Sequence, residues 1–156
     1  MPTTPCHDKI VVSACLLGGA CRYDGSARYH AAVATFVHMQ RANGVEVVTV
    51  CPEELGGLGT PRPAADLQGG DGHAVLTGTA RVLVCGAMNE RRDVTAAFVR
   101  GAEQAAQQGH SASLAILKAN SPSCGVGTTH IDGHRLPGDG VFAAMLRRAG
   151  VPLRTE

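Results

Sequence analysis

The chain of 156 residues contains very few aromatic side chains: two Tyr, three Phe and no Trp. Proteins that bind single-stranded nucleic acid usually stack the bases on aromatic side chains, so this scarcity argues against a surface that binds single strands of DNA or RNA. The formal net charge is only +1, so no overall field attracts nucleic acid or an anionic membrane. No apolar run is long enough to cross a bilayer. These absences argue against a membrane protein and make a nucleic-acid partner unexpected.

Signals for export are also lacking. Residues 1–8 have no basic start followed by an apolar stretch, so we expect a cytoplasmic protein. In that reducing compartment, the six Cys residues are expected to be thiols or metal ligands rather than disulfides. There is no C-x-x-C pair and no zinc-finger spacing, which disfavours a thioredoxin-type redox site. We expect Cys6 to have no specific role and Cys85 to have a structural role only.

The composition, 44% apolar and 17% charged, predicts one globular domain that spans residues 1–156. Strand-like and helical patterns alternate, which predicts an α/β fold: a mostly parallel sheet flanked by helices, in a Rossmann-like or flavodoxin-like sandwich. Asp93 and Asp139 are expected to cap helices. The expected elements are strands at 9–15, 45–50, 113–118, 129–131 and 151–154, helices at 27–42, 94–108 and 141–148, a strand pair at 73–78 and 80–85, and an irregular segment at 52–72.

Three cysteines follow the main strand-like runs. Cys15 and Cys51 close the first two runs, and Cys124 follows the third by a short loop. Because parallel strands end at one edge of a sheet, where α/β folds build their sites, the three thiols are predicted to converge. Three thiolates without a fourth partner are typical of a metal or cluster with one open position. The alternative is that each is a small buried hydrophobic residue.

A fourth candidate ligand is Cys21, six residues after Cys15 in the same glycine-rich loop. It could serve as a fourth ligand or as a thiol next to the ligands. We rank it below the other three because its loop is expected to lead away from the strand end.

Several motifs are spread along almost the whole chain. They are Ser13-Ala14-Cys15-Leu16-Leu17-Gly18, Arg22-Tyr23-Asp24-Gly25, Cys51-Pro52-Glu53, Gly56-Gly57-Leu58, Pro61-Arg62-Pro63, Leu117-Lys118, Ser121-Pro122-Ser123-Cys124-Gly125 and Gly138-Asp139-Gly140-Val141. Together they resemble the 2-thiouracil desulfidase family. The resemblance implies a 4Fe-4S cluster that is held by Cys15, Cys51 and Cys124 and leaves one iron open. Asp66 departs from the family pattern, in which we would expect the longer Glu.

The resemblance also implies an activity, the desulfuration of 2-thiouracil or a related small thiolated pyrimidine to uracil and sulfide. An iron without a protein ligand is a Lewis acid that suits a soft sulfur ligand. Water can then add to the thiocarbonyl carbon and sulfide can leave, with no net electron transfer. Three alternatives stay open: desulfuration of thiolated nucleosides in RNA, a non-catalytic iron–sulfur or sulfide carrier, and a structural zinc module.

Candidate residues for proton transfer lie beside the cysteines. Glu53, two residues after Cys51, is expected to be the general acid and base, because a carboxylate in an apolar cleft can have a pKa near neutrality. Ser121 and Ser123 could position water or the substrate, or could simply form local turn hydrogen bonds. Glu54 is expected to be a surface residue.

Three cations are candidates for contact with the substrate. Arg22 and Arg62 could contact a pyrimidine carbonyl, or could form structural salt bridges, for instance with Asp24. Lys118 at the end of its strand could be catalytic or could extend to solvent. The seven His residues show no metal-ligand spacing and are assigned to the surface or to packing.

Overall fold

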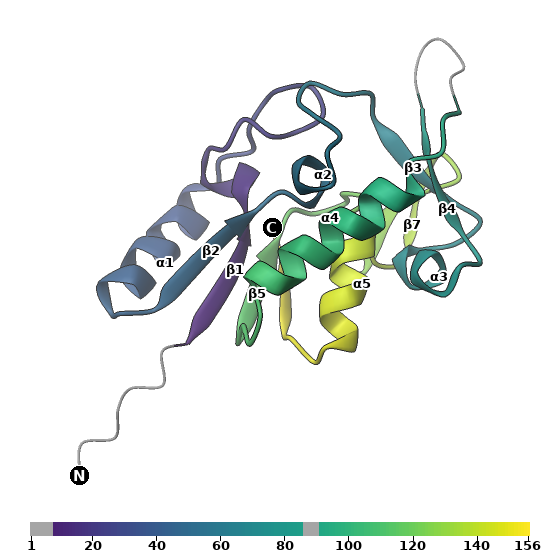
Figure 1. The fold of residues 1–156 in the computed structure, drawn as a ribbon. Helices are drawn as coiled ribbons and strands as arrows, with labels where there is room; N and C mark the ends of the chain where they lie inside the picture. Colours follow the sequence, from purple (N-terminus) through teal and green to yellow (C-terminus); the bar gives the residue numbers. More distant parts are fainter. Residues whose placement is uncertain (1–7, 86–90) are drawn as a thin grey trace.

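The computed structural model describes residues 8–85 and 91–156, and a parallel sheet of four strands forms its centre. Strand β1 pairs in parallel with β2 and β5, and β8 extends the sheet beside β5 (Figure 1). The predicted parallel α/β sheet is therefore confirmed. The elements are β1 (Lys9–Ser13), η1 (Ala14–Leu17), α1 (Ala31–Ala42), β2 (Glu46–Val50), α2 (Pro52–Leu55), β3 (Ala65–Gln68), α3 (Gly72–Thr77), β4 (Arg81–Val84), α4 (Thr95–Gln108), β5 (Leu114–Leu117), β6 (Thr128–Ile131), β7 (His134–Pro137), α5 (Val141–Arg148) and β8 (Leu153–Thr155).

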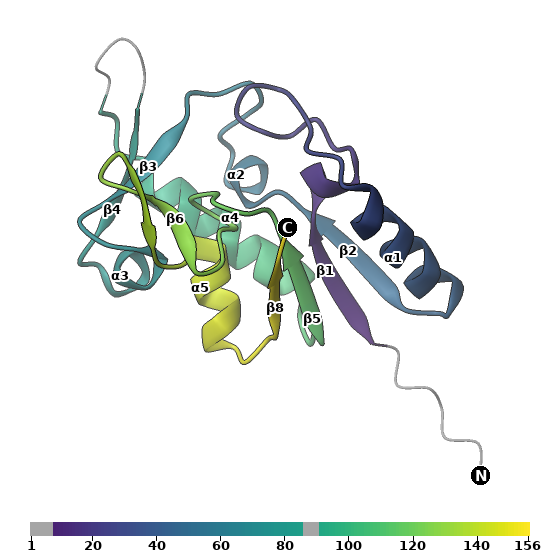
Figure 2. The same cartoon turned by 180° about the vertical axis from the view of Figure 1, so that it is seen from behind.

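Helices cover both faces of this sheet. Successive residues of a strand point to opposite faces, so β1 contributes to two apolar cores. Ile10 and Val12 pack in one core with Val33 and Val37 of α1, whereas Val11 packs in the other core with residues of α4 and α5. Helix α4 lies in front of the sheet in Figure 1, and α1 lies in front in the reverse view of Figure 2. The predicted arrangement of a sheet between helices is thus present.

A second sheet of four strands lies beyond α4 and α5, at the end of the molecule away from α1 (Figure 2). Its order is β4-β3-β6-β7, and β6 and β7 form a hairpin whose turn residues Asp132 and Gly133 both have positive φ. The expected strand at 73–78 is wrong, because this segment is helix α3, which begins where the Asp71 carboxylate accepts a hydrogen bond from Ala74 N. The strand at 80–85 pairs instead with β3, inside the segment that was expected to be irregular.

Other boundaries differ in smaller ways. Helix α1 begins at Ala31 rather than at 27, since His30 Nδ1 accepts the hydrogen bond of Val33 N at 3.3 Å. Asp93 accepts a hydrogen bond from Thr95 N at the start of α4, close to its predicted capping role. None of the helices among the described residues has the length and hydropathy that a membrane span requires.

The structure tests the expectation for Cys85 but not the one for Cys6. Cys85 follows β4 and is exposed, so it does not pack in the core. Cys6 falls outside the described residues.

Helix α2, which begins directly after Cys51, packs backbone against backbone on α4. A Cβ atom on Gly101 would lie 1.8 Å from the Pro52 carbonyl oxygen, and one on Gly56 would lie 2.1 Å from the Ala97 carbonyl oxygen. Only glycine allows the two helices to approach this closely. Because α2 begins directly after Cys51, the contact also fixes where Cys51 and its neighbours lie relative to α4.

The loop that carries Cys124 is held by the start of α5. The carbonyl oxygens of Pro122 and Ser123 accept hydrogen bonds from the first two N–H groups of α5, both at 2.9 Å. These N–H groups have no partner within their own helix, so the loop satisfies them. A Cβ atom on Gly140 would lie 2.6 Å from Ser123 backbone atoms, so glycine is needed at this contact.

Asp139 ties the same loop to two helices. Its buried carboxylate accepts hydrogen bonds from Gly127 N at 2.9 Å, from Arg147 Nε at 2.7 Å and from His73 Nε2 at 2.8 Å. The predicted role as a helix cap is wrong, because Gly140 is the N-cap and Asp139 bonds across the loop. Burial alone would raise the pKa of Asp139, but the hydrogen bonds from Arg147, Gly127 and His73 outweigh it and lower the pKa to about 2.

The substitution Gly101→Ala should destabilise the protein. The new methyl group would collide with the Pro52 carbonyl, so α2 must move away from α4. The free energy of unfolding should fall by about 2 kcal/mol, the range for overpacking. Urea denaturation measures this value, with the exposed Gln104→Ala on the same helix as control. Equal stability of the two variants would contradict the close packing of α2.

The substitution Asp139→Asn should lower the free energy of unfolding by about 2 kcal/mol at neutral pH, because it removes hydrogen bonds to a charged group. A depressed pKa contributes stability above the unfolded pKa, and this stability is lost as pH falls toward the folded pKa of about 2. The gap between wild type and variant should therefore shrink below about pH 4. Denaturation from about pH 6 to about pH 3 tests this, with Glu46→Gln at an exposed site as control. A gap that stays constant with pH would contradict the prediction.

Candidate functional site

A cavity of about 430 Å³ opens at the carboxyl edge of the parallel sheet. Ser13 and Cys15 line it at the end of β1, Cys51 lines it after β2, and Lys118 lines it after β5. Cys124 lines the same cavity from its loop. The three cysteines that follow separate strands therefore meet at one edge, as the strand order predicts.

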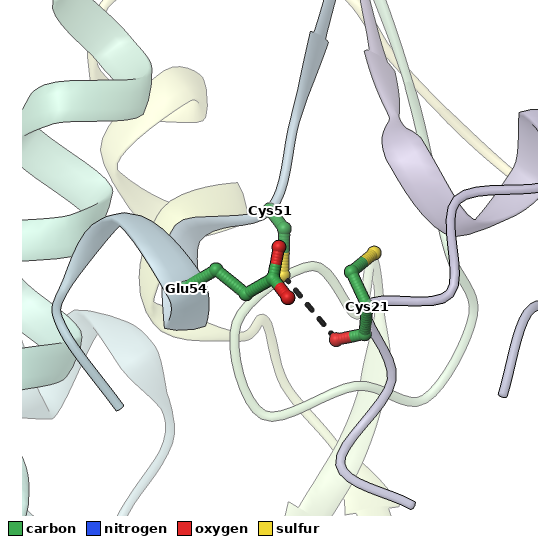
Figure 3. A group of neighbouring side chains, drawn as sticks. All are labelled: Cys21, Cys51 and Glu54. Carbon is green, nitrogen blue, oxygen red and sulfur yellow. Dashed lines mark hydrogen bonds between the residues drawn. The ribbon is translucent and has the colours of Figure 1, made fainter. Parts of the chain in front are cut away.

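Cys21 also lines this cavity. Its Sγ atom, the Cys51 Sγ atom and a carboxylate oxygen of Glu54 all lie within 4.8 Å of one another (Figure 3). The Cys51 thiol donates a hydrogen bond to the Cys21 carbonyl at 3.6 Å, and Arg62 Nη2 donates to the same oxygen at 2.9 Å. The prediction that the loop leads Cys21 away from the strand end is wrong, because these two contacts fold the loop back over Cys51.

The spacing of the thiols distinguishes two kinds of metal site. Around one tetrahedral ion with bonds of about 2.3 Å, sulfur atoms lie about 3.8 Å apart. Cys15, Cys51 and Cys124 do not form a group within 4.8 Å in the described part of the chain, so at least one pair of their sulfurs is farther apart. An iron–sulfur cluster binds each thiolate through a different iron, and thiolates are its usual ligands. These three residues therefore fit a cluster better than a single ion.

The four thiols change one another's protonation. The hydrogen bond with Cys21 lowers the pKa of Cys15 despite its burial, and the charge of Lys118 acts in the same direction. The same hydrogen bond raises the pKa of Cys21 to about 11. The contact with Cys21 and then burial raise the pKa of Cys51, and burial raises that of Cys124 to about 12. Cys15 is thus the thiol that most readily loses its proton.

Glu53 presents a buried carboxylate to the cavity from α2, and its side chain is 15% exposed. Arg62 Nε donates a hydrogen bond to Oε1 at 3.2 Å, and Ser123 Oγ donates to Oε2 at 3.4 Å. Burial raises the pKa of Glu53, although the charge and hydrogen bond of Arg62 oppose it. The carboxylate is therefore fixed in orientation and holds a proton more readily than an exposed one.

The two candidate serines have different surroundings. Ser121 lines the cavity, and its Oγ accepts hydrogen bonds from the N–H groups of Ser123 and Cys124, both at 3.1 Å. This is the local turn bonding that the sequence offered as the alternative. Ser123 is 1% exposed and donates a hydrogen bond to Glu53, so it orients the carboxylate from within the protein interior.

The arginines have partners other than those expected. Arg62 is paired with Glu53, which confirms a structural salt bridge but not with Asp24 as the partner. Arg22 lines the cavity and donates to Ser26 Oγ at 3.3 Å. Ser26 in turn donates to Asp24 from its backbone N at 2.9 Å, so it stands between Arg22 and the expected acid. Glu54 is exposed, as predicted, but lies beside two thiols.

Lys118 reaches the cavity from the end of β5, and its Nζ donates to the Ala119 carbonyl at 2.9 Å. Burial lowers its pKa.

Asp66, which stands where the family pattern would have Glu, also lines the cavity. Sequence reasoning missed several lining residues or assigned them to packing, because they come from a loop or from the second sheet: Tyr23, Arg28, Asn120, His130 and Arg135.

The sequence and the fold have counterparts in known proteins. Over residues 10–156 the chain matches the family described as 2-thiouracil desulfurase. It is 40% identical over 152 residues to the uncharacterized protein YbbK of Bacillus subtilis (strain 168), covering 94% of this chain and 95% of YbbK. The structure is similar to that of the 4Fe-4S-dependent thiouracil desulfidase TudS, with a TM-score of 0.77 and 38% identity over 96% of this chain and 91% of TudS. The chain therefore belongs to the 2-thiouracil desulfurase family.

Proposed function

We propose that this protein removes the sulfur of 2-thiouracil, or of a related thiolated pyrimidine, and releases uracil and sulfide without net electron transfer. The observation that carries the proposal is the convergence of Cys15, Cys51 and Cys124 on one cavity beside the buried carboxylate of Glu53. Family membership and the likeness to TudS support it. The carrier and RNA alternatives are not favoured, because the matching family and the similar structure TudS are both named for the desulfuration of thiouracil.

Cys15, Cys51 and Cys124 hold a 4Fe-4S cluster in this proposal, and one iron has no protein ligand. These three residues would hold the cluster, which would supply a Lewis-acidic iron suited to a thiocarbonyl sulfur. The separation of at least one pair of these sulfurs by more than 4.8 Å and the placement of all three residues around one cavity support this ligand set. Since thiolates persist in a reducing compartment, we place the activity in the cytoplasm.

Glu53 moves the proton. Its carboxylate accepts one proton from the water that adds to the thiocarbonyl carbon, and it returns that proton to the departing sulfur as the carbon–sulfur bond breaks. The remaining hydroxyl proton also passes to the sulfur as the carbonyl forms, so 2-thiouracil and water give uracil and hydrogen sulfide. Arg62 and Ser123 bind one carboxylate oxygen each, so the group keeps its orientation through both transfers. Ser121 borders the cavity and places the Cys124 loop through two N–H groups.

Arg22 and Lys118 orient the pyrimidine. Both line the cavity, and both carry N–H donors that suit the exocyclic oxygen or the ring nitrogens of the substrate. Arg62 has most of its donors engaged by Glu53, Cys21 and the Gly59 carbonyl, so it acts through these residues.

The proposal is tested by anaerobic reconstitution with iron and sulfide, followed by incubation with 2-thiouracil. Uracil and sulfide should appear in equal amounts, measured by chromatography and by a colorimetric sulfide assay. A protein that retains about four irons but forms no uracil would contradict the proposed enzyme and favour a carrier.

The cysteine ligands can be separated by single substitutions. Alanine at position 15, 51 or 124 should abolish retention of the cluster, because each removes one of only three ligands. Cys21→Ala should keep most of the iron and the broad visible absorption. Iron analysis after gel filtration measures this. Loss of the cluster in Cys21→Ala would show that the site has four protein ligands and no open iron.

The substitution Glu53→Gln keeps the shape of the side chain and removes its acid–base function. We expect kcat to fall by about 10²- to 10⁴-fold, the usual contribution of a positioned acid or base. The iron content should match that of wild type. Glu103→Gln, at an exposed site on α4, serves as the control. Turnover of Glu53→Gln within a few fold of this control would exclude Glu53 as the proton carrier.

A further inference from the structure

Three donor atoms form a compact group beside the cavity, which Cys21 and Cys51 line. They are the Sγ atoms of Cys21 and Cys51 and a carboxylate oxygen of Glu54, all within 4.8 Å of one another (Figure 3). Donors around a tetrahedral zinc ion lie about 3.3 to 3.8 Å apart, so side-chain shifts of about 1 Å would complete the geometry. Within residues 8–85 and 91–156, no other set of three such side chains is as compact.

We propose that in the cluster-free protein Cys21, Cys51 and Glu54 bind a single divalent ion of the zinc type. Two thiolates and one carboxylate are ligands that zinc accepts, and water completes the fourth position. The inference rests on the proposed function in one respect only, because Cys51 is also a proposed cluster ligand.

The protein already holds these donors in place. Cys51 and Glu54 lie on the same turn, since the Leu55 N–H donates to the Cys51 carbonyl at 3.0 Å at the start of α2. The contact of α2 with Gly101 fixes that turn on α4. Cys21 is held from the other side, because its carbonyl accepts hydrogen bonds from Arg62 and from the Cys51 thiol. The ion therefore has little backbone to order.

Charge and access also suit a cation. The guanidinium that bonds the Cys21 carbonyl is that of Arg62, and its charge is compensated by the salt bridge with Glu53 at 3.2 Å. Glu54 is exposed, so an ion can approach from solvent, whereas Cys21 is buried at 7% exposure. One oxygen of Glu54 accepts a hydrogen bond from Thr60 Oγ1, and the other remains to bind the ion.

Because both proposed metal sites use Cys51, binding of a single ion should affect binding of the cluster. Cys51 cannot bind the single ion and the cluster together, so occupancy of one site excludes the other. A zinc-loaded chain should therefore take up iron and sulfide more slowly than a metal-free chain. The arrangement makes cluster assembly sensitive to competing thiophilic metals.

The test uses full-length, cluster-free protein kept reduced without oxygen. Cobalt(II) serves as the spectroscopic probe, and zinc is added in competition. Wild type should bind one cobalt ion with a thiolate-to-cobalt charge-transfer band that one equivalent of zinc removes. Cys21→Ser should weaken zinc binding by at least about 100-fold and Glu54→Gln by about 10-fold, since ligand loss costs at least as much as loss of an outer partner. Cys124→Ser and Glu103→Gln should bind zinc like wild type.

Three results would overturn the inference. Zinc affinity in Cys21→Ser equal to that of wild type would remove Cys21 from the site, and an equal loss in Cys124→Ser would move the ion onto the cluster cysteines. Circular dichroism checks folding, and if Cys21→Ser is unfolded, an unchanged affinity in Glu54→Gln overturns the site. Because zinc binding is measured without the cluster, failure to form uracil would leave this result intact.

Discussion

The parallel pairing of β1 with β2 and β5 is the constraint on which the site depends. Ser13 is paired with Val50, so Cys15 and Cys51 leave the sheet at neighbouring points on one edge. The Lys118 N–H donates to Ser13 Oγ at 3.0 Å, which brings the end of β5 to the same place. A shift of one residue would exchange the two faces of β1 and move Val11 out of its core. The packing of the two cores therefore also fixes the position of the thiols.

A chain of hydrogen bonds then connects the segments that carry the cysteines. Arg62 bonds both the Cys21 carbonyl and Glu53, and Glu53 bonds Ser123 next to Cys124. Next to this chain, glycine contacts allow α2 to pack on α4, and the first N–H groups of α5 donate hydrogen bonds to the loop that carries Cys124. Glu53 thus joins two roles, since the same two bonds that hold its carboxylate also link the cysteine-bearing segments. Its burial follows from that position and is what favours the proton-bearing form.

Local sequence was sufficient for the features that depend on short-range pattern. The β-branched run of β1 and the run of β2 predicted parallel strands, and their ends predicted where Cys15 and Cys51 would meet. The second sheet could not be predicted in the same way, because β3 has no β-branched residue and forms by pairing with β4 and β6. Residues 73–78 have strand-like composition, yet the Asp71 cap and the packing of Gly72 against Gly140 select a helix.

The position of Cys21 is the clearest case of long-range control. The sequence of its loop contains no local pattern that predicts where Cys21 lies. The loop is folded back by contacts with Cys51 and Arg62, which are 30 and 41 residues away in the chain. Arg62 also pairs with Glu53 rather than with Asp24, the acid that the sequence suggested. Motif resemblance supplied the ligand set and the activity, but it could not supply this arrangement. Only the folded chain shows that a fourth thiol lies beside the proposed three.

The most direct test of the central claim is Mössbauer spectroscopy of protein reconstituted with isotopically enriched iron, before and after addition of hydrosulfide. If three cysteines hold the cluster and one iron is open, one of the four irons should differ from the rest and should change its spectrum when hydrosulfide binds. Four equivalent irons that hydrosulfide does not affect would contradict the claim, because they would show a cluster closed by a fourth protein ligand.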